Sequence, residues 1–194
     1  MITRLNYLSF LLVILLIGCA GPSHIETNYY QLTPVSDETT YPYRKALVIA
    51  PVTIPEALKR KAIVSYGDDK SSLILPNSEL WAGDLRELIL DVVEYDLQLS
   101  FPDAEVTTFN SHQNRQSSLK LDIQIQELAG KLGEYVNLSA HWQITDKNDA
   151  LLIQRRSEHK MSLDDGSYTT YVAAMSELIG HMSEEIARAI SQQN

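Results

Sequence analysis

Two stretches of strict alternation between apolar and polar residues constrain the fold of this chain most strongly. In the first, apolar residues at 119, 121, 123 and 125 alternate with Lys120, Asp122, Gln124 and Gln126. In the second, apolar residues at 136, 138, 140, 142 and 144 alternate with Asn137, Ser139, His141 and Gln143. Because neighbouring side chains of a strand point to opposite faces, each stretch predicts a strand with one buried and one solvated face.

Turn residues connect these strands to each other and to a third. Gly130 and Gly133 lie between the two stretches, and Lys147-Asn148-Asp149 precedes another β-prone segment near residues 150–161. Short turns between consecutive strands favour antiparallel pairing. The sequence therefore predicts a three-strand antiparallel meander in the C-terminal half.

Helical periodicity appears on both sides of this meander. Residues 77–99 carry apolar side chains three, four or seven apart: Trp81, Leu85, Leu88, Ile89, Val92 and Leu99. Asn77 or Ser78 is the expected cap of this first helix, with Glu79 in its first turn. A second helix is expected after Asp164-Asp165-Gly166-Ser167, with an inner stripe of Tyr171, Met175, Leu178, Met182, Ile186 and Ile190.

Shorter elements are expected nearer the N-terminus. Strands are predicted at 29–33 and 46–54, a helical turn at 55–60, and a hairpin that joins 62–66 to 72–75. Strands and helices are grouped rather than regularly alternating, which is typical of the α+β class. We expect residues 29–194 to form a single α+β domain, with two long amphipathic helices packed on one face of a mainly antiparallel sheet.

The first residues have the layout of an export signal. One positive charge, Arg4, precedes an apolar run that ends in Leu16-Ile17-Gly18-Cys19, a sequence that resembles the bacterial lipobox. We therefore predict that residues 1–18 are a signal peptide, and that Cys19 acquires an S-diacylglyceryl group and an amide-linked acyl chain, palmitate in the usual case. The alternatives are an ordinary secretory signal and a permanent anchor, for which the apolar run is short.

Cys19 is the only cysteine of the chain, so no internal disulfide and no cysteine-ligated metal site is expected. Residues 20–28 are polar and broken by Gly21 and Pro22, so residues 19–28 are predicted to be the lipidated cysteine and a tether that reaches about 30 Å at most. Ala20 follows the lipidated position, where Asp commonly favours retention in the inner membrane. By that resemblance the protein is expected on the periplasmic face of the outer membrane.

The charge balance argues against two kinds of partner. The net charge is −9, and both signs are interspersed along the chain, which argues against nucleic acid and against an anionic lipid face as the partner.

No pattern of catalytic or metal-binding residues stands out. The five histidines, His24, His112, His141, His159 and His181, lie in separate segments without a His-Glu-x-x-His spacing. His141 and His159 could be cross-strand neighbours on the solvated face, which is a weak metal hypothesis without a third ligand. Acidic pairs lie at predicted turns or on a helix exterior. We therefore expect no catalytic residues, no metal, no cofactor and no enzymatic activity.

Large apolar residues have two readings. Met175 and Met182 could form an adaptable binding surface, but their helical spacing favours the core. Trp81 and Trp142 are likewise interpreted as core residues.

Three stretches taken together resemble one family. They are the early YYQL strand followed by LVIAPVTIPEAL and a basic pair, Trp81 after Pro76, and the closing helix AAMSELIGHMSEEIARAI. The order of these motifs is similar to that of the PqiC (YmbA-like) family of ABC-transport auxiliary lipoproteins. The chain departs from the family pattern at Arg60-Lys61-Ala62, where members often have Arg-Pro-Gln, and at Leu80, where Arg is common.

The resemblance implies a non-catalytic outer-membrane subunit that works with an MCE-domain protein in lipid transport between the two membranes and so protects the envelope. The lipoprotein would dock the periplasm-spanning MCE assembly to the outer membrane. Both a monomer and a homo-oligomer are compatible with this role. One alternative is a standalone lipid- or ligand-binding lipoprotein with an apolar pocket between helices and sheet. Another is an envelope hydrolase.

Overall fold

The computed structural model describes residues 26–35, 39–109 and 119–193. The predicted signal peptide, its lipobox residues Leu16, Ile17 and Gly18, and Cys19 lie outside these ranges, as do His24 and His112.

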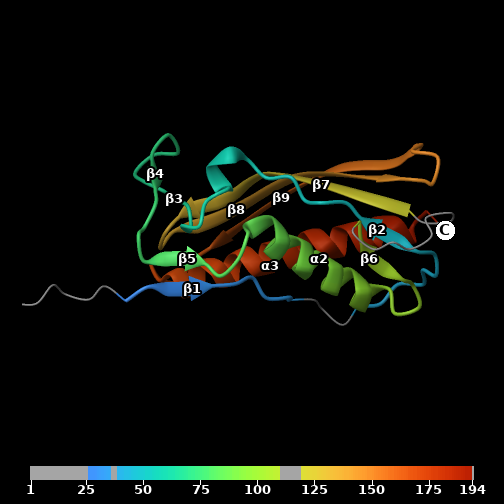
Figure 1. Cartoon of the computed structure of the whole chain (residues 1–194), viewed down its shortest axis with the longest axis horizontal. Coiled ribbons are helices and arrows are strands. Elements are labelled where there is room, and N and C mark those ends of the chain that lie inside the picture. Colours follow the sequence, from blue (N-terminus) through green and yellow to red (C-terminus); the bar gives the residue numbers. More distant parts are fainter. Residues whose placement is uncertain (1–25, 36–38, 110–118, 194) are drawn as a thin grey trace, which may run out of the picture.

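The C-terminal meander is the centre of the fold (Figure 1), and its prediction is confirmed. The strand β8 pairs antiparallel with β7 on one side and with β9 on the other. The bounds are Leu119–Lys131 for β7, Tyr135–Thr145 for β8 and Leu151–Ser162 for β9. A register shift between Ile125 and Glu127 moves the inward positions of β7 from odd to even numbers, so that Leu128 is buried. This β-bulge explains why the alternation in the sequence stops at Gln126 while the strand continues.

Short strands complete the sheet along the other edge of β7. Near its start β7 pairs parallel with β2, which in turn pairs parallel with β6; near its end it pairs parallel with β3, which forms a hairpin with β4. The bounds are Leu47–Ile49 for β2, Val106–Thr108 for β6, Ser65–Tyr66 for β3 and Leu73–Ile74 for β4. The predicted hairpin is thus confirmed, the expected turn at 55–60 is the 3₁₀ helix Glu56–Leu58, and the sheet is mixed.

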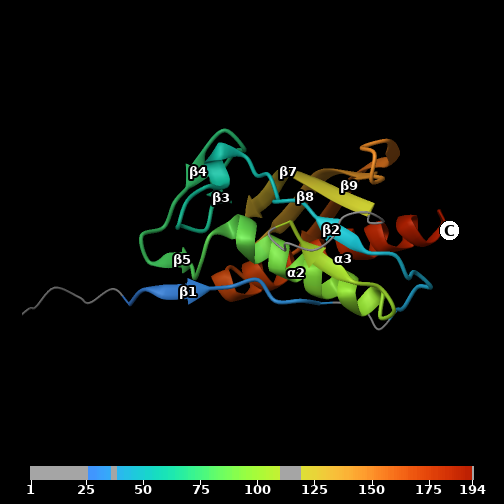
Figure 2. The ribbon, with the colours of Figure 1, turned by 45° about the vertical axis from the view of Figure 1, so that its right-hand side comes forward.

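Two helices form a layer over one face of the sheet, which confirms the predicted α+β arrangement (Figures 1 and 2). Helix α3, Tyr168–Ser191, packs on β8 and β9, and helix α2, Leu85–Ser100, packs on α3 and β6. The Ser167 hydroxyl caps α3 by accepting the backbone N–H of Thr170 at 3.1 Å. The whole predicted stripe of α3, from Tyr171 to Ile190, is buried.

The prediction for the first helix was wrong at its start. Residues Glu79–Trp81 form strand β5, which pairs parallel with β1, Asn28–Tyr30, and the helix begins only at Leu85. Its cap is Asp84, not Asn77 or Ser78, because the Asp84 carboxylate accepts the Arg86 N–H at 2.9 Å. Trp81 is buried as predicted, although from a strand, and Leu99 lies on the outer side of α2 with 45% of its surface exposed.

No helix within the described ranges has the length and apolar character needed to cross a membrane.

Candidate functional site

The face of the sheet opposite the helices carries the polar half of the alternating pattern. A groove of about 390 Å³ lies on this face, where the segment after β2 runs beside β7. Its lining includes the side chains of three glutamines, Gln124, Gln143 and Gln154, together with Thr53 and His141. Amides both donate and accept hydrogen bonds, so the groove can pair with the backbone or polar side chains of a partner.

The groove forms because two elements meet at this position. Residue 53 pairs with the edge of β7: Thr53 N–H donates to the Ile123 carbonyl at 3.0 Å, and Ile125 N–H donates to the Thr53 carbonyl at 2.8 Å. These bonds hold Pro51 and Thr53 beside the row of glutamines. The outward polar positions were visible in the sequence, but the crossing segment was not.

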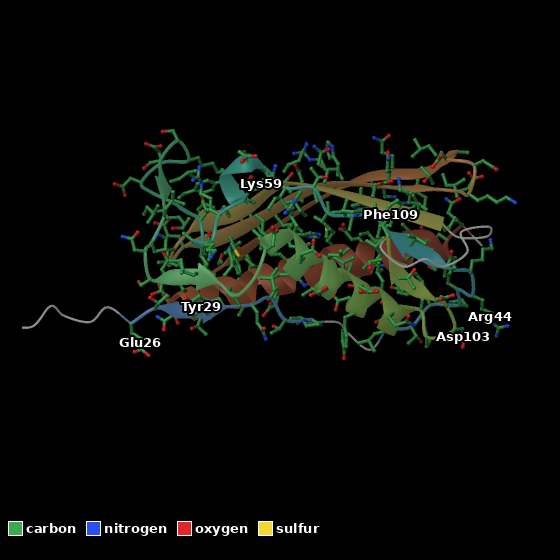
Figure 3. All side chains as sticks on the ribbon, in the orientation of Figure 1. Glu26, Tyr29, Arg44, Lys59, Asp103 and Phe109 are labelled. Carbon is green, nitrogen blue, oxygen red and sulfur yellow. The ribbon has the colours of Figure 1, made fainter. Side chains whose placement is uncertain are left out.

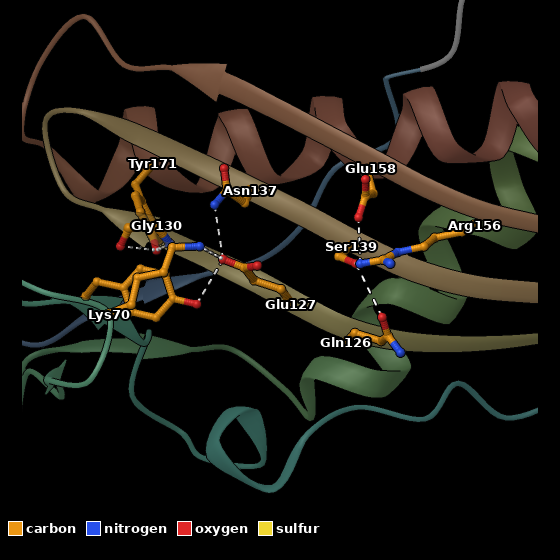
Figure 4. Close-up of polar contacts among 10 residues, drawn as sticks. Lys70, Gln126, Glu127, Gly130, Asn137, Ser139, Arg156, Glu158 and Tyr171 are labelled. Carbon is orange, nitrogen blue, oxygen red and sulfur yellow. Dashed lines mark hydrogen bonds and ion pairs between the residues drawn. The ribbon is translucent and has the colours of Figure 1, made fainter.

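A hydrogen-bonded hub lies further along the same strand, near the β3–β4 hairpin. Glu127 accepts hydrogen bonds from Tyr66 at 3.0 Å, Lys70 at 3.1 Å and Asn137 at 3.0 Å (Figure 4). Partial burial alone would raise the pKa of Glu127, but these donors hold the pKa below its ordinary value. Glu127 therefore stays ionised and joins the hairpin to the central meander.

A second polar row crosses the open face between hub and groove. The Arg156 guanidinium contacts Glu158 at 2.6 Å and donates to the Ser139 hydroxyl at 3.3 Å, and that hydroxyl lies 3.5 Å from Gln126 (Figure 4). Exposed ion pairs of this kind add little stability, typically below about 1 kcal/mol. The Arg156–Glu158 pair instead determines where charged groups lie on the open face of the sheet.

The cluster that most resembles a catalytic site lies between β9 and α3. The Ser157 hydroxyl accepts the indole N–H of Trp142 at 2.9 Å and donates to Glu185. His159 Nε2 lies 3.4 Å from the same carboxylate, and the His159 and His181 rings are 5.7 Å apart. In a hydrolase triad the histidine must contact the serine. Here the Ser157 hydroxyl and the His159 ring both contact the Glu185 carboxylate instead, and Ser157 is only 1% exposed. The cluster ties the edge strand β9 to α3.

The two histidines considered as a cross-strand pair are not neighbours, so that expectation was wrong. His141 pairs with Arg156 and lines the groove, whereas His159 pairs with Leu138 and faces the helix layer. Within residues 26–35, 39–109 and 119–193, no three His, Cys, Asp or Glu side chains are grouped as metal ligands would be.

A basic turn lies on another side of the molecule. Lys59, Arg60 and Lys61 are exposed and line a hollow of about 230 Å³ beside the start of α2. Lys59 pairs with Glu56 at 2.9 Å. This turn is where the chain departs from the Arg-Pro-Gln pattern, and Figure 3 shows Lys59 well away from Tyr29.

The end of the sheet beneath the hairpin is held by one buried tyrosine. The Tyr171 hydroxyl of α3 accepts the Gly130 N–H at 2.7 Å (Figure 4). The same hydroxyl lies 3.0 Å from the Val64 carbonyl, to which it can donate. Burial raises the pKa of Tyr171 well above its ordinary range, so the hydroxyl keeps its proton. A Cβ at residue 130 would lie 1.9 Å from the Tyr135 carbonyl oxygen, which explains the glycine.

The space between the sheet and the helices is filled by large side chains. Trp142, Tyr171, Met175 and Met182 are each at most 2% exposed, which confirms the core interpretation of both methionines and of Trp142.

The geometry thus defines a small α+β protein with a helix-covered face and a polar, grooved face suited to binding. The sequence model of the ABC-type transport auxiliary lipoprotein component family matches residues 30–187. The chain therefore belongs to this family of transport auxiliary lipoproteins, as its resemblance predicted. The family is not an enzyme family; its name implies membrane anchoring and association with an ABC-type transport system.

Solved structures agree with the fold. An uncharacterised protein superposes with a TM-score of 0.72 at 21% identity, over 85% of this chain and 99% of that one. A protein from Xanthomonas campestris superposes with a TM-score of 0.70 at 13% identity, over 86% and 97%. At these identities the likeness shows the fold alone. A search of curated proteins found no match.

Proposed function

We propose that this lipoprotein is the outer-membrane subunit of an MCE-type intermembrane lipid-transport system. A lipid on Cys19 would hold it at the membrane, and its folded part would dock the periplasm-spanning MCE protein. The observation that carries the proposal is the family match over residues 30–187, which names an auxiliary lipoprotein of ABC-type transport. The MCE partner comes from the PqiC-like resemblance of the sequence.

The anchor rests on the N-terminal sequence. Leu16-Ile17-Gly18 precedes the single cysteine, and Ala20 follows it. Each buried methylene of an attached chain contributes about 0.8 kcal/mol, so a triacylated Cys19 would stay in the bilayer. Ala20 in place of Asp supports the outer membrane.

Docking is best assigned to the open face of the sheet. The helices cover the other face, while the groove presents hydrogen-bonding side chains from three strands and from Thr53. Three of the groove's lining side chains are amides and one, Asp122, is acidic, so the expected occupant is a polar segment of the MCE protein without acidic side chains. The Arg156 row and, beyond it, the Glu127 hub lie to one side of this groove and would fix the orientation of the bound MCE segment.

The alternative of a standalone lipid-binding lipoprotein requires apolar room between helices and sheet. Trp142, Met175 and Met182 occupy that space with almost no exposed surface. The packing therefore favours docking over lipid storage.

Co-purification with the MCE protein tests the proposal. We expect the wild-type chain and Cys19→Ser to retain the MCE protein, because the folded part makes the contact. Gln143→Arg places a charge in the groove and should weaken recovery at least tenfold. Asp91→Arg, a charge change on the exposed side of α2, is the matched control and should have no effect. Equal recovery of the MCE protein with both arginine variants would contradict the groove as the docking site. No recovery of the MCE protein under crosslinking, with any variant, would contradict docking itself.

A further inference from the structure

An exposed apolar hairpin lies at the end of the molecule from which the tether departs. Leu73, Ile74 and Leu75 are 43%, 48% and 44% exposed, although they follow one another in sequence. Among the strands of the described ranges, β4 pairs with β3 alone, through Ser65 with Ile74 and Tyr66 with Leu73. Among the described residues, these three form the longest run of consecutive exposed large apolar side chains.

The turn of this hairpin is firmly built. Gly67 N–H donates to the Ser72 carbonyl at 2.8 Å, and the Asp69 carboxylate accepts the backbone N–H groups of Ser71 at 2.7 Å and Ser72 at 3.1 Å. Lys70 is held by Glu127 at 3.1 Å. The apolar side chains are thus displayed by an ordered element, and their exposure is a property of the fold.

The position of the hairpin relates it to the membrane. In Figures 1 and 2, β4 and the start of β1 lie at the same end of the long axis, and Figure 3 shows Glu26 and the exposed Tyr29 there. The nine residues that follow Cys19, residues 20–28, span about 30 Å at most. A chain anchored at Cys19 therefore keeps this end close to the bilayer.

The distribution of the exposed side chains indicates the nature of the contact. Successive residues of a strand point to opposite faces, so Leu73 and Ile74 expose both faces of β4, and the exposed Leu75 follows directly after it. A protein partner would ordinarily cover one face, whereas the interfacial layer of a bilayer can contact both faces of an edge strand. That layer also contains water, which can satisfy the free backbone groups of an edge strand.

From this geometry we propose that the β3–β4 hairpin inserts Leu73, Ile74 and Leu75 into the interfacial layer of the membrane that holds the lipid anchor. The proposal rests on the lipid anchor of the proposed function. Asp68 and Asp69 in the turn are exposed, and the chain is net acidic. The contact therefore requires no anionic lipid and is driven by apolar burial rather than by charge. It would fix the tilt of the folded part on the membrane.

Site-specific fluorescence on the full lipidated chain tests this. Once Cys19 carries its thioether-linked lipid, an introduced Ile74→Cys is the only free thiol and can take an environment-sensitive dye. Leu152→Cys is the matched control, because Leu152 is 44% exposed and also on an edge strand. It lies far from the hairpin: its neighbour Leu151 pairs with Thr145 at one end of β8, whereas β3 pairs with Lys131, which lies beside Tyr135 at the other end. Both proteins are reconstituted into phosphatidylcholine–phosphatidylethanolamine vesicles.

We expect a blue-shifted emission for the Ile74 label, several-fold stronger quenching by nitroxide lipids than for the Leu152 label, and little change in 0.5 M salt. A vesicle-bound chain whose Ile74 label is quenched from the water as readily as the Leu152 label would overturn the insertion but leave the anchor intact. Shielding that appears only when the MCE protein is added would assign the hairpin to that partner and overturn the insertion. Mass spectrometry that finds Cys19 without lipid, on a chain that does not sediment with vesicles, would overturn the anchor as well.

Discussion

A buried carboxylate between the two helices predicts an unusual pH dependence of stability. Asp96 of α2 is 1% exposed, and neither of its carboxylate oxygens meets hydrogen-bond geometry with a partner among the described residues. It adjoins a small space of about 20 Å³ whose lining includes the titratable residues His181 and Glu184. Burial raises the pKa of Asp96 to about 6, and the nearby Ser183 hydroxyl lowers it only in part.

The sign and size follow from proton linkage. Between the unfolded pKa of 3.8 and the folded pKa of about 6, the folded state binds more protons, so stability falls as the pH rises through this range. One pKa unit corresponds to about 1.4 kcal/mol, which makes the ionised carboxylate cost about 3 kcal/mol above pH 6. Asp96→Asn removes the charge but keeps a buried polar group, so we expect it to stabilise the fold by about 1 to 3 kcal/mol at pH 7.5.

Urea unfolding at pH 4, 5, 6 and 7.5 measures this effect. The gain from Asp96→Asn should shrink towards zero at pH 4, where the wild-type carboxyl is protonated in the folded state. Asp91→Asn, on the exposed side of the same helix, should change stability by less than about 0.5 kcal/mol at each pH. A destabilised Asp96→Asn at pH 7.5, or a gain that does not vary with pH, would refute the reasoning.

Three further changes test the packing by the same urea assay. Tyr171→Phe leaves the buried Gly130 N–H without its acceptor and should lower the free energy of unfolding by about 1 to 3 kcal/mol. A loss near zero would mean that this hydrogen bond does not stabilise the fold. Trp81→Ala should cost about 3 to 5 kcal/mol because the indole is buried, and a neutral result would contradict that burial. Leu99→Ala should lower the free energy of unfolding by less than about 0.5 kcal/mol, because Leu99 is exposed. A loss as large as that of a core leucine would mean that Leu99 is buried, as its helical spacing predicted.

The long, periodic elements could be predicted from the sequence because their burial is decided locally. The α3 stripe and the alternation in β8 follow directly from which face each side chain occupies. The start of α2 could not be found from periodicity, because Trp81 and Leu85 have helical spacing although Trp81 pairs with Tyr30 of β1. The signal for the true start was Asp84 followed three residues later by Glu87, a capping pattern.

The candidate site depends on pairings between distant segments, which no local pattern encodes. The groove requires Thr53 to lie beside Gln124, and the Glu127 hub requires Tyr66 and Lys70 from the hairpin. The bulge after Ile125 also changes which residues of β7 face outward. The sequence therefore predicted a polar face but not the groove in it.

The attachment of the MCE protein to the outer membrane tests the proposed function most directly. Cells that express the wild-type chain or Cys19→Ser are crosslinked and their membranes are separated on a density gradient. The account predicts that the MCE protein is recovered with outer-membrane fractions in the presence of the wild-type chain. With Cys19→Ser that recovery should be lost, although the two proteins still co-purify. Unchanged recovery with Cys19→Ser would contradict a lipid tether at Cys19 as the link between the two.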